Sequence, residues 1–424
     1  MKSFLDKIFL RSNNLDKVSK KIKNLNKVTP IKKIFEAITS YSLDGEIRYV
    51  GGCVRKILSG EEVDDIDMAT NLNPDQVCSA LKKKDIEYFE TGIEHGTVTA
   101  LINGHKFEIT SLREDISTDG RHAKVRFSKD WKKDASRRDF TINSIYSDYE
   151  GNLFDPFNGK KDLEAGIVNF IGDADKRIKE DYLRILRYLR FFSNYSNQPH
   201  SVEIIKNLKI NIKGTSKLSK ERLLDELIKI SKLETLEKLT KNKFSLEIIL
   251  LVFPELKNIH LFSNLTSYKK KILIKSDFIF LLSLMIIDNT DNSDYFLYRF
   301  NISKKDQKRI KVISNFFKEN KASKVFTERN MNKFFYFKGK EALIDILNFK
   351  IIKSKKFDEK LINLRDFYIS KEKPIMPISA DTLMVKYKIP EGRHLGLKLK
   401  ILEDKWVDNN FKISDQEVDH ILKG

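Results

Sequence analysis

Three aspartates lie close together in the segment VDDIDMAT, at Asp64, Asp65 and Asp67. If this segment is a β-strand, Asp65 and Asp67 share one face and Asp64 lies on the other, because alternate side chains point the same way. Two carboxylates on one face repel each other and are tolerated in water or around a cation. Glu108, in the alternating segment KFEIT, adds another strand-borne carboxylate. A surface acidic cluster is the alternative, but these oxygen ligands suit Mg²⁺ and metal-assisted phosphoryl transfer.

A pair of glycines precedes the acidic segment. In RYVGGCVRK a predicted strand ends at Gly51 and Gly52, and a helix follows with Arg55 near its start. Glycines let the backbone approach a ligand closely, and the free N–H groups at a helix start bind phosphate. Arg55 would add a charge to the same anion. A tight turn alone explains the glycines, but with the carboxylates they indicate a site for a nucleotide phosphate.

The segment RRDFTINSIYSD, residues 137–148, brings further polar groups. Its residues Arg138, Asp139 and Asn143 open what we predict to be an apolar helical stretch. Guanidinium and carboxylate groups suit the phosphate and sugar of a nucleotide. The simpler interpretation is a charged helix start.

The periodicity of KEDYLRILRYLRFF, residues 179–192, predicts one amphipathic helix. Its polar face carries Asp181, Arg184 and Arg187, with Arg190 at the edge. Ion pairing along an exposed face is the simpler interpretation. The more specific one is base selection, because a carboxylate accepts from the exocyclic amine of cytosine or adenine while a guanidinium donates to the adjacent ring nitrogen. Uracil and guanine would leave both groups unpaired, at about 1–3 kcal/mol for each buried group.

Strands and helices alternate in the part of the chain that must position these residues. A helix is predicted to begin after Asn73, with Pro74 at its first position. A hairpin is predicted around Asn103-Gly104, a strong short-range turn pattern. The predicted elements are strands at 46–50 and 65–69, a helix at 73–86 and a hairpin at 96–112.

Helical periodicity replaces the strand patterns after about residue 170 and continues to the end. The most apolar segment, FIFLLSLMII at 278–287, is too short to cross a membrane and is predicted to be a buried helix. The N-terminal residues lack the apolar region of a secretory signal. The chain is long enough for two to four domains, and its cysteines, Cys53 and Cys78, fit a reducing compartment.

The charge balance points to a polyanionic partner. Lys and Arg number 79 against 60 Asp and Glu, so the formal net charge is +19. Nucleic acid and an anionic membrane surface both suit such an excess, although a biased codon usage also makes proteins basic. Lysine clusters at 268–275, 303–311 and 350–357 alternate with apolar residues. Each suits the solvated side of a helix or contact with a phosphate backbone.

Several segments together resemble one family, the class II tRNA nucleotidyltransferases or CCA-adding enzymes, which belong to the tRNA nucleotidyltransferase/poly(A) polymerase family. The resemblance runs from about residue 47 to 192, weakens through SKERLLDELIKI, and returns in ISADTLMVKYKIPEGRHLGLKLKILEDKW near the end. The segments that carry it are GGCVR, DIDMAT, EHGTVTALINGHKFEITSLREDISTDGRHAKV, DWKKDASRRDFTINS and RIKEDYLRILRYLRFF.

The resemblance implies an α+β fold, with a small polymerase-β-like nucleotidyltransferase head followed by an all-α neck, body and tail. The head would be a mixed sheet with helices, the neck would select nucleotides and bind RNA, and the body and tail would bind tRNA. The implied parts are an N-terminal extension at 1–30, the head at 31–172, the neck at 173–262, and the body and tail at 263–424.

The activity implied is template-independent addition of C, C and A to the 3′ end of tRNA from CTP and ATP, and repair of that end. The implied reaction is two-metal nucleotidyl transfer with Mg²⁺ and release of pyrophosphate. Asp65 and Asp67 would bind the metal and act with Glu108 in catalysis. We expect a cytoplasmic protein with no membrane and no obligate protein partner. The residues implied to hold the nucleotide are Gly51, Gly52, Arg55, Arg138, Asp139, Asn143, Asp181, Arg184, Arg187 and Arg190.

The chain departs from the family pattern at Lys56, where Asp is usual, and the effect on nucleotide affinity stays open. The flexible loop that accompanies addition of the final A in this family is present at 113–125, with Asp119, Gly120 and Arg121.

Three alternatives remain. A poly(A) polymerase, or an enzyme adding only CC or only A, would share the head. The loop at 113–125 disfavours a CC-adding enzyme, and the tail-like segment disfavours a poly(A) polymerase. A non-catalytic RNA-binding protein is the alternative from a different class, and it has no need of the carboxylates or of the base-selecting pair.

Overall fold

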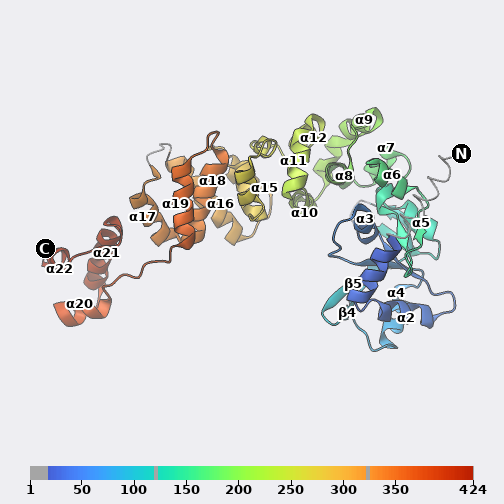
Figure 1. The fold of residues 1–424 in the computed structure, drawn as a ribbon, viewed down its shortest axis with the longest axis horizontal. Coiled ribbons are helices and arrows are strands. Elements are labelled where there is room, and N and C mark those ends of the chain that lie inside the picture. The colour runs from blue at the N-terminus through green and yellow to red at the C-terminus, as the bar shows by residue number, and fades with distance from the viewer. Residues whose placement is uncertain (1–17, 119–122, 321–324, 424) are drawn as a thin grey trace. The chain divides into compact units, whose positions relative to one another are not determined.

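A computed structural model describes residues 18–118, 123–320 and 325–423 (Figure 1). The chain forms two compact units. The first contains the described residues up to Ile230 together with Asn242–Val252, and the second contains Ser231–Lys241 and the chain from Phe253 onward. The predicted boundaries at residues 30, 172 and 262 are a different division and stay predictions.

A mixed β-sheet forms the centre of the first unit. In the part of the chain that is described, its strand order is β3-β4-β5-β2-β1-β8-β9. β2 runs parallel to β5, and the other pairs in the sheet are antiparallel. A separate ribbon joins β6 to β7. The strands are β1 (Ile47–Val50), β2 (Asp67–Thr70), β3 (Glu87–Gly92), β4 (Thr97–Ile102), β5 (His105–Ser111), β6 (Arg113–Thr118), β7 (Ala123–Phe127), β8 (Tyr146–Ser147) and β9 (Leu153–Phe154).

Three helices cover this sheet through one shared apolar core, to which residues 18–28, also helical, contribute Val18 and Ile22. Burial of alternate residues along β4 and β5 matches the pleat of a sheet with one covered face. The covering helices are α2 (Lys32–Tyr41), α3 (Gly52–Ser59) and α4 (Pro74–Lys82).

Local sequence explains two of these elements. Asn73 and Gln76 form a reciprocal capping box at the start of α4, with Pro74 at its first position, as predicted. The predicted hairpin turn is also confirmed, because Asn103 (φ 51°) and Gly104 (φ 79°) both adopt the left-handed region. α4 ends at Lys82 rather than at residue 86, because Asp85 has a φ of 51°, which a right-handed helix does not contain.

The prediction of a helix in residues 137–148 is wrong. Here the chain leaves α5 (Trp131–Ser136), makes the 3₁₀ turn η2 (Thr141–Asn143) and enters β8. The apolar residues serve the sheet instead, since Tyr146 pairs with Val50 of β1. Tertiary pairing therefore overrides a helical periodicity in this segment.

The rest of the first unit is helical, and the described chain has no strand after β9, as the fading strand patterns predicted. Its remaining elements are α6 (Gly159–Ala165), α7 (Ala174–Glu180), α8 (Leu183–Tyr195), α9 (Val202–Asn211), η3 (Ile212–Lys217), α10 (Lys220–Ile230) and α12 (Lys243–Val252), and the short 3₁₀ turn η1 (Ile93–His95) lies between β3 and β4.

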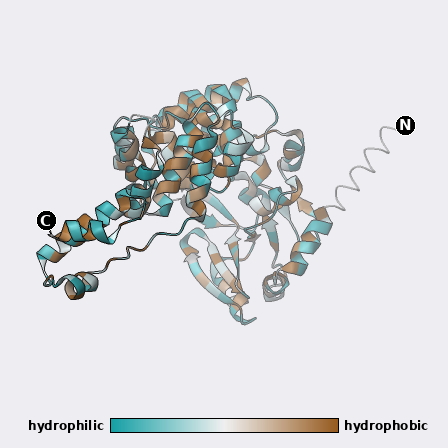
Figure 2. Cartoon of the chain, turned by 60° about the vertical axis from the view of Figure 1, so that its left-hand side comes forward, coloured by the Kyte–Doolittle hydropathy of each residue, from teal (hydrophilic) through white to brown (hydrophobic). Residues whose placement is uncertain are grey.

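The second unit is built of helices whose apolar and polar residues alternate along the ribbon (Figure 2). α14 (Phe278–Ile286) is buried from Phe280 onward, which confirms the prediction for that segment. Among the described residues, no helix is both long and apolar enough to cross a membrane. The other elements are α11 (Leu233–Lys241), η4 (Ile259–Phe262), α13 (Ser267–Leu273), α15 (Asn292–Arg299), α16 (Lys304–Glu319), α17 (Glu328–Lys338), α18 (Lys340–Lys353), α19 (Glu359–Ser370), α20 (Ala380–Tyr387), α21 (Arg393–Asp408) and α22 (Asp415–Lys423).

Candidate active site

A cavity of about 400 Å³ in the first unit brings together most of the residues singled out in the sequence. Every member of that set lines it except Asp65 and Glu108. Phe191, which the sequence analysis did not single out, completes the lining. The lining residues are Gly51, Gly52, Arg55, Asp67, Arg138, Asp139, Asn143, Asp181, Arg184, Arg187, Arg190 and Phe191.

The turn between β1 and α3 forms one wall of the cavity. Gly51 has a φ of +65°, a conformation that L side chains rarely adopt. α3 begins at Gly52, where an added Cβ would lie 4.0 Å from Oδ2 of Asp67. The start of α3 therefore lies close to this carboxylate, and the free N–H groups of a helix start suit an anion.

The carboxylates come from β2, β5 and the segment before β2. Asp67 and Glu108 are partners in the parallel register and so point to the same face. β2 begins at Asp67, so the prediction that Asp65 lies within the strand is wrong. Burial raises the pKa of Asp67, and the charges of Glu108 and Asp65 raise it further against the opposing effect of Arg138 and Arg55.

These carboxylates fit Mg²⁺. A bound cation would offset the repulsion that Asp67 feels from its acidic neighbours. No group of three or more His, Cys, Asp and Glu side chains in the described chain is arranged to hold a metal by itself. Mg²⁺ needs only one or two carboxylates because water and substrate phosphates supply the other ligands.

Asp64 stands apart from this site, as predicted. Its exposed carboxylate forms an ion pair with Lys56, and this contact lowers the pKa of Asp64. Neither residue lines the cavity. Lys56, the departure from the family pattern, therefore has its charge paired with Asp64.

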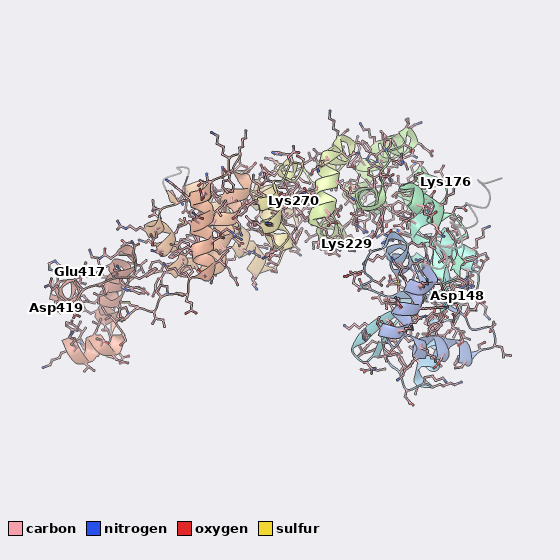
Figure 3. The ribbon with its side chains drawn as sticks, viewed as in Figure 1. Asp148, Lys176, Lys229, Lys270, Glu417 and Asp419 are labelled. Atoms are coloured by element: carbon pink, nitrogen blue, oxygen red, sulfur yellow. The ribbon has the colours of Figure 1, made fainter. Side chains whose placement is uncertain are left out.

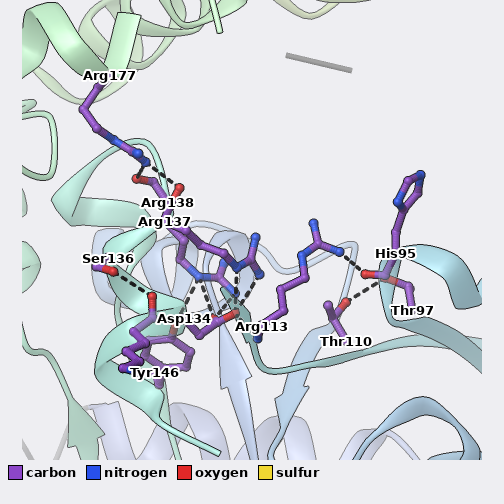
Figure 4. Close-up of polar contacts among 11 residues, drawn as sticks. His95, Thr97, Thr110, Arg113, Asp134, Ser136, Arg137, Arg138, Tyr146 and Arg177 are labelled. Atoms are coloured by element: carbon purple, nitrogen blue, oxygen red, sulfur yellow. Dashed lines mark hydrogen bonds and ion pairs between the residues drawn. The ribbon is translucent and has the colours of Figure 1, made fainter. Parts of the chain in front are cut away.

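Asp134 is a buried anchor that the sequence patterns did not identify. Its side chain is 1% exposed, and Nη2 of Arg137 and Nη2 of Arg138 lie 2.7 and 3.2 Å from its two oxygens (Figure 4). The Tyr146 hydroxyl donates to the same carboxylate at 2.7 Å. Burial opposes ionisation, but Arg138 and Arg137 outweigh it and lower the pKa of Asp134 to about 2. Arg177 adds a donor from α7 to the Arg138 carbonyl at 2.6 Å.

Asp139 and Asn143 hold two more arginines of the cavity. Nε of Arg187 donates to Oδ2 of Asp139 at 2.7 Å, and Nδ2 of Asn143 donates to Oδ1 at 2.8 Å. Arg55 donates to Oδ1 of Asn143. Burial raises the pKa of Asp139, but Arg187 and Asn143 reverse this and lower it to about 2. This relay links α3, η2 and α8, and it keeps Asp139 ionised.

The predicted single helix at 179–192 is broken at Asp181. α7 ends at Glu180, Asp181 is extended with φ −153°, and α8 begins at Leu183. The prediction that Asp181, Arg184 and Arg187 share one face of a single helix is therefore wrong. The three residues nevertheless line the same cavity. Oδ1 of Asp181 accepts from the Leu183 amide at 3.1 Å.

Two acids and one arginine outside the cavity lining, Glu180, Glu226 and Arg222, pair with charged residues that line it. Nη2 of Arg222, on α10, donates to Oδ2 of Asp181 at 2.8 Å. Nη1 of Arg184 donates to Oε2 of Glu180 at 2.7 Å. Arg190 pairs with Glu226, whose side chain is 1% exposed. Arg222 and Glu226 both lie in SKERLLDELIKI, the segment that resembles the family more weakly. That resemblance is the sequence pattern that could have identified them.

Phe191 packs among three of the arginines. The guanidinium carbons of Arg190, Arg55 and Arg187 lie 4.3, 4.8 and 5.5 Å from its ring centre. A ring face stabilises a cation by several tenths of a kcal/mol to about 2 kcal/mol when water is excluded. The ring thus keeps a group of like charges close together around a cavity suited to a polyphosphate.

The predicted flexible loop falls partly within β6 and β7, which pair from Arg113–Phe127 to Thr118–Ala123. Asp119, Gly120 and Arg121 lie outside the described residues.

Comparison with known proteins agrees with this arrangement. Residues 47–169 match the family described as the poly A polymerase head domain. The chain is 47% identical over 188 residues to the human protein named CCA tRNA nucleotidyltransferase 1, mitochondrial, a match covering 44% of this chain and 43% of the relative. It is 37% identical over 189 residues to the CCA-adding enzyme of Lactobacillus johnsonii, covering 44% of this chain and 46% of that protein. The match thus spans less than half the length of these curated relatives.

Solved structures extend the likeness beyond the head. The Bacillus stearothermophilus CCA-adding enzyme in complex with CTP has a TM-score of 0.68 at 20% identity, covering 93% of this chain and 97% of that one. The Thermotoga maritima CCA-adding enzyme complexed with tRNA has a TM-score of 0.62 at 20% identity, covering 94% of this chain and 95% of that one. At this identity the likeness shows the fold, which is the predicted α+β head followed by helices.

Proposed function

We propose that this chain, whose head belongs to the tRNA nucleotidyltransferase/poly(A) polymerase family, adds C, C and A to the 3′ end of tRNA from CTP and ATP and repairs that end. The observation that carries the proposal is the cavity itself. It joins a glycine turn at a helix start, the Asp67 carboxylate, and an Asp181 and Arg184 pair within one space. The chain is also 36–47% identical, over 188 to 205 residues, to relatives named as CCA tRNA nucleotidyltransferases or CCA-adding enzymes.

The nucleotide would bind through its phosphates and its base at opposite sides of the cavity. Gly51, Gly52 and Arg55 would receive the triphosphate, because backbone N–H groups and a guanidinium favour an anion. Arg138, held on Asp134, would add a fixed charge to the same group. Since these donors are already positioned by buried partners, binding would need little reorganisation of the protein.

The base would be read by Asp181 and Arg184. Asp181 would accept from the exocyclic amine of cytosine or adenine, and Arg184 would donate to the neighbouring ring nitrogen. Arg222 and Glu180 hold these two side chains, while Arg187 and Arg190 support the site through Asp139 and Glu226. Uracil and guanine would leave both reading groups unpaired, at about 1–3 kcal/mol each.

The reaction would be an in-line attack of the tRNA 3′-hydroxyl on the α-phosphate, with pyrophosphate as the leaving group. Asp65 and Asp67, with Glu108 beside them, would hold Mg²⁺, which when bound polarises phosphate oxygens and lowers the pKa of the attacking hydroxyl. The arginines of the cavity would hold the pyrophosphate as it leaves. The proton of the 3′-hydroxyl would pass to a carboxylate or to water.

Product length tests the proposal. Purified protein and Mg²⁺ are given tRNA transcripts that end at the discriminator base, with each nucleotide alone and with CTP and ATP together. Addition of C, C and then A supports the proposal. A long ladder from ATP alone would mean a poly(A) polymerase, a stop after two cytidines would mean a CC-adding enzyme, and no product would leave a non-catalytic RNA-binding protein.

The compartment stays a prediction. We inferred a cytoplasmic protein from the sequence, whereas the human relative carries the word mitochondrial in its name. Fractionation of the source cells with antibodies to the protein would decide between these locations.

A further inference from the structure

A second cavity, of about 360 Å³, lies in the helical second unit. It is lined by Thr266 to Lys269 at the start of α13, by residues at the end of α18, and by the connection that leads into α19. These segments belong to two of the lysine clusters, 268–275 and 350–357, which are far apart in the sequence. The fold therefore brings two separate basic segments to one hollow.

Hydrogen bonds fix the walls of this cavity. Nζ of Lys269 donates to the carbonyls of Ile352 and Ser354 at 2.8 and 2.7 Å, and so ties α13 to the end of α18. Oγ of Ser354 donates to the Lys356 carbonyl at 2.9 Å. The Asp358 carboxylate accepts from the Leu361 amide at 3.1 Å as the N-cap of α19. Lys269 and Asp358 are thus occupied in holding the connection.

The groups left for a ligand are two cations and an aromatic ring. Lys355 and Lys356 are exposed, and neither forms an ion pair with the residues that the structure describes. Lys270 of α13, which is labelled in Figure 3, in contrast forms an ion pair with Glu237 at 2.7 Å. Phe357 follows directly and is 75% exposed, with its ring centre 6.1 Å from that of Tyr268 at an angle of 81°.

Tyr268 adds a second ring to the lining of the cavity. Its hydroxyl oxygen is buried and has Arg365 as a neighbour, so the hydroxyl is not available to a ligand. What the cavity offers to a ligand is therefore ring surface from Tyr268 and Phe357. A nucleic-acid base has an aromatic face that suits such rings.

We propose that this cavity binds one unstacked nucleotide of an RNA, with the base against Phe357 and Tyr268 and the flanking phosphates on Lys355 and Lys356. Unpaired lysines favour phosphate, and an exposed ring beside a hollow favours a base freed from its stack. A lipid surface would use the lysines but not the hollow. The identity of the RNA as tRNA rests on the proposed function, whereas the binding of an unstacked nucleotide does not.

The test compares full-length variants in tRNA binding over a series of salt concentrations. Phe357→Ala should weaken binding by roughly tenfold or more, because one stacked base is lost. Lys355→Ala with Lys356→Ala should lower the slope of log K against log salt by roughly 1.5 to 2, because two phosphate contacts are lost.

Matched controls in the same unit separate this site from general charge and folding effects. Tyr298 is 86% exposed, so Tyr298→Ala removes an exposed ring elsewhere. Lys238 and Lys241 are exposed on α11, outside the three lysine clusters, so their double alanine variant removes the same charge elsewhere. The proposal is overturned if Phe357→Ala binds tRNA as tightly as the parent does. It is also overturned if either control variant changes tRNA binding as much as the cavity variant to which it is matched. A different ligand would also overturn the proposal. This would be the result if the parent bound anionic vesicles and the Phe357 and lysine variants lost that binding while they still bound tRNA.

Extension assays keep the two proposals apart. If the parent protein extends tRNA and the cavity variants bind tRNA normally, only the proposal for the second cavity is wrong. If the parent extends no tRNA but Phe357→Ala still weakens RNA binding, the proposed function fails and the RNA site stands. With both correct, the cavity variants raise KM for tRNA and leave kcat and the nucleotide preference unchanged.

Discussion

Buried partners explain how so many arginines can line one cavity. Arg138 is held by Asp134, Arg187 by Asp139 and Arg190 by Glu226, and all three carboxylates are at most 8% exposed. Like charges at such close range repel, and a partner for each offsets this cost. The cations keep their positions because their partners are fixed by packing. The proposed triphosphate would therefore meet charges that are already in place.

Asp67→Asn should abolish nucleotide incorporation while leaving tRNA binding nearly unchanged. The amide keeps the shape of the side chain but cannot serve as a charged metal ligand, so we expect a loss of at least about 100-fold in kcat. Asp64→Asn is the matched control, because Asp64 faces Lys56 outside the cavity. Single-turnover incorporation and filter binding measure the two effects. Near-parent activity of Asp67→Asn would remove the basis for the metal site.

Asp181→Ala should relax base choice more than it weakens RNA binding. Loss of the accepting carboxylate removes the advantage of cytosine and adenine, so the preference over uracil and guanine should fall by about tenfold or more. Competition assays with all four nucleotides give that ratio. Asp175→Ala, on the exposed side of α7, is the control. An equal loss for every nucleotide would rule out a role in base reading.

At the scale of the elements, a break between two helices and a close contact with a third element surround Asp181. The chain turns between α7 and α8 at Tyr182, whose ring packs on Gly214 of η3. A Cβ on Gly214 would lie 2.0 Å from the ring, so only glycine fits there without displacement. The residue that follows Asp181 is thus closely packed against another element.

Gly214→Ala should lower the free energy of unfolding by about 1–3 kcal/mol, as overpacking does. Because Tyr182 must move, KM for the nucleotide should also rise. Urea unfolding and steady-state kinetics measure the two quantities. Gly396→Ala, at an open position inside α21, should not lower the free energy of unfolding, because alanine favours a helix, and should leave KM unchanged. A stable Gly214→Ala protein with unchanged KM would contradict the proposed link between η3 and Asp181.

His200 ties α8 to α12 and should make the stability of the first unit depend on pH. Its ring stacks on Phe192, and its nitrogens lie 3.0 Å from the Tyr188 hydroxyl and 3.1 Å from the Asn242 amide oxygen. Burial lowers its pKa from 6.5 to about 4. Between these values the unfolded chain binds the proton more readily, so the folded state loses stability as pH falls.

The measurement is urea unfolding at several pH values from neutral to about pH 4.5. The parent should be destabilised over this range by more than His200→Gln, which lacks the titrating ring. His105→Gln, at an exposed position, should follow the parent. Identical pH profiles for the parent and His200→Gln would show that the buried imidazole makes no contribution.

Features fixed by neighbouring residues were predictable, whereas those fixed by distant partners were not. The cap at Asn73 and the turn at Asn103-Gly104 depend on local hydrogen bonds and on φ, so the sequence predicts both. The break at Asp181 was missed because the residues that contact it are distant in the sequence: Arg222 of α10 pairs with Asp181, and Gly214 of η3 packs on Tyr182. Glu226 was missed because an acid in an amphipathic helix normally indicates a solvated face, and its arginine partner lies on another helix.

At the scale of the whole molecule, charge should govern RNA affinity. With a formal net charge of +19, the protein should release several counterions from bound RNA. The affinity for tRNA should therefore fall by at least about tenfold between about 50 and 200 mM salt. Filter binding at a series of salt concentrations measures the slope. A flat profile would exclude phosphate contacts as the main source of affinity.

The path of the chain between the two units has a consequence for how the gene can be divided. Because α11 belongs to the second unit and α12 to the first, the chain crosses between units after residues 230, 241 and 252. A cut at any one of these points gives fragments that do not match the two units. A fragment then carries a helix of the other unit, or lacks a helix of its own unit. Recombination that replaces one unit with that of a relative would succeed only if α11 moved with the second unit and α12 with the first. The two units are therefore expected to have been inherited together.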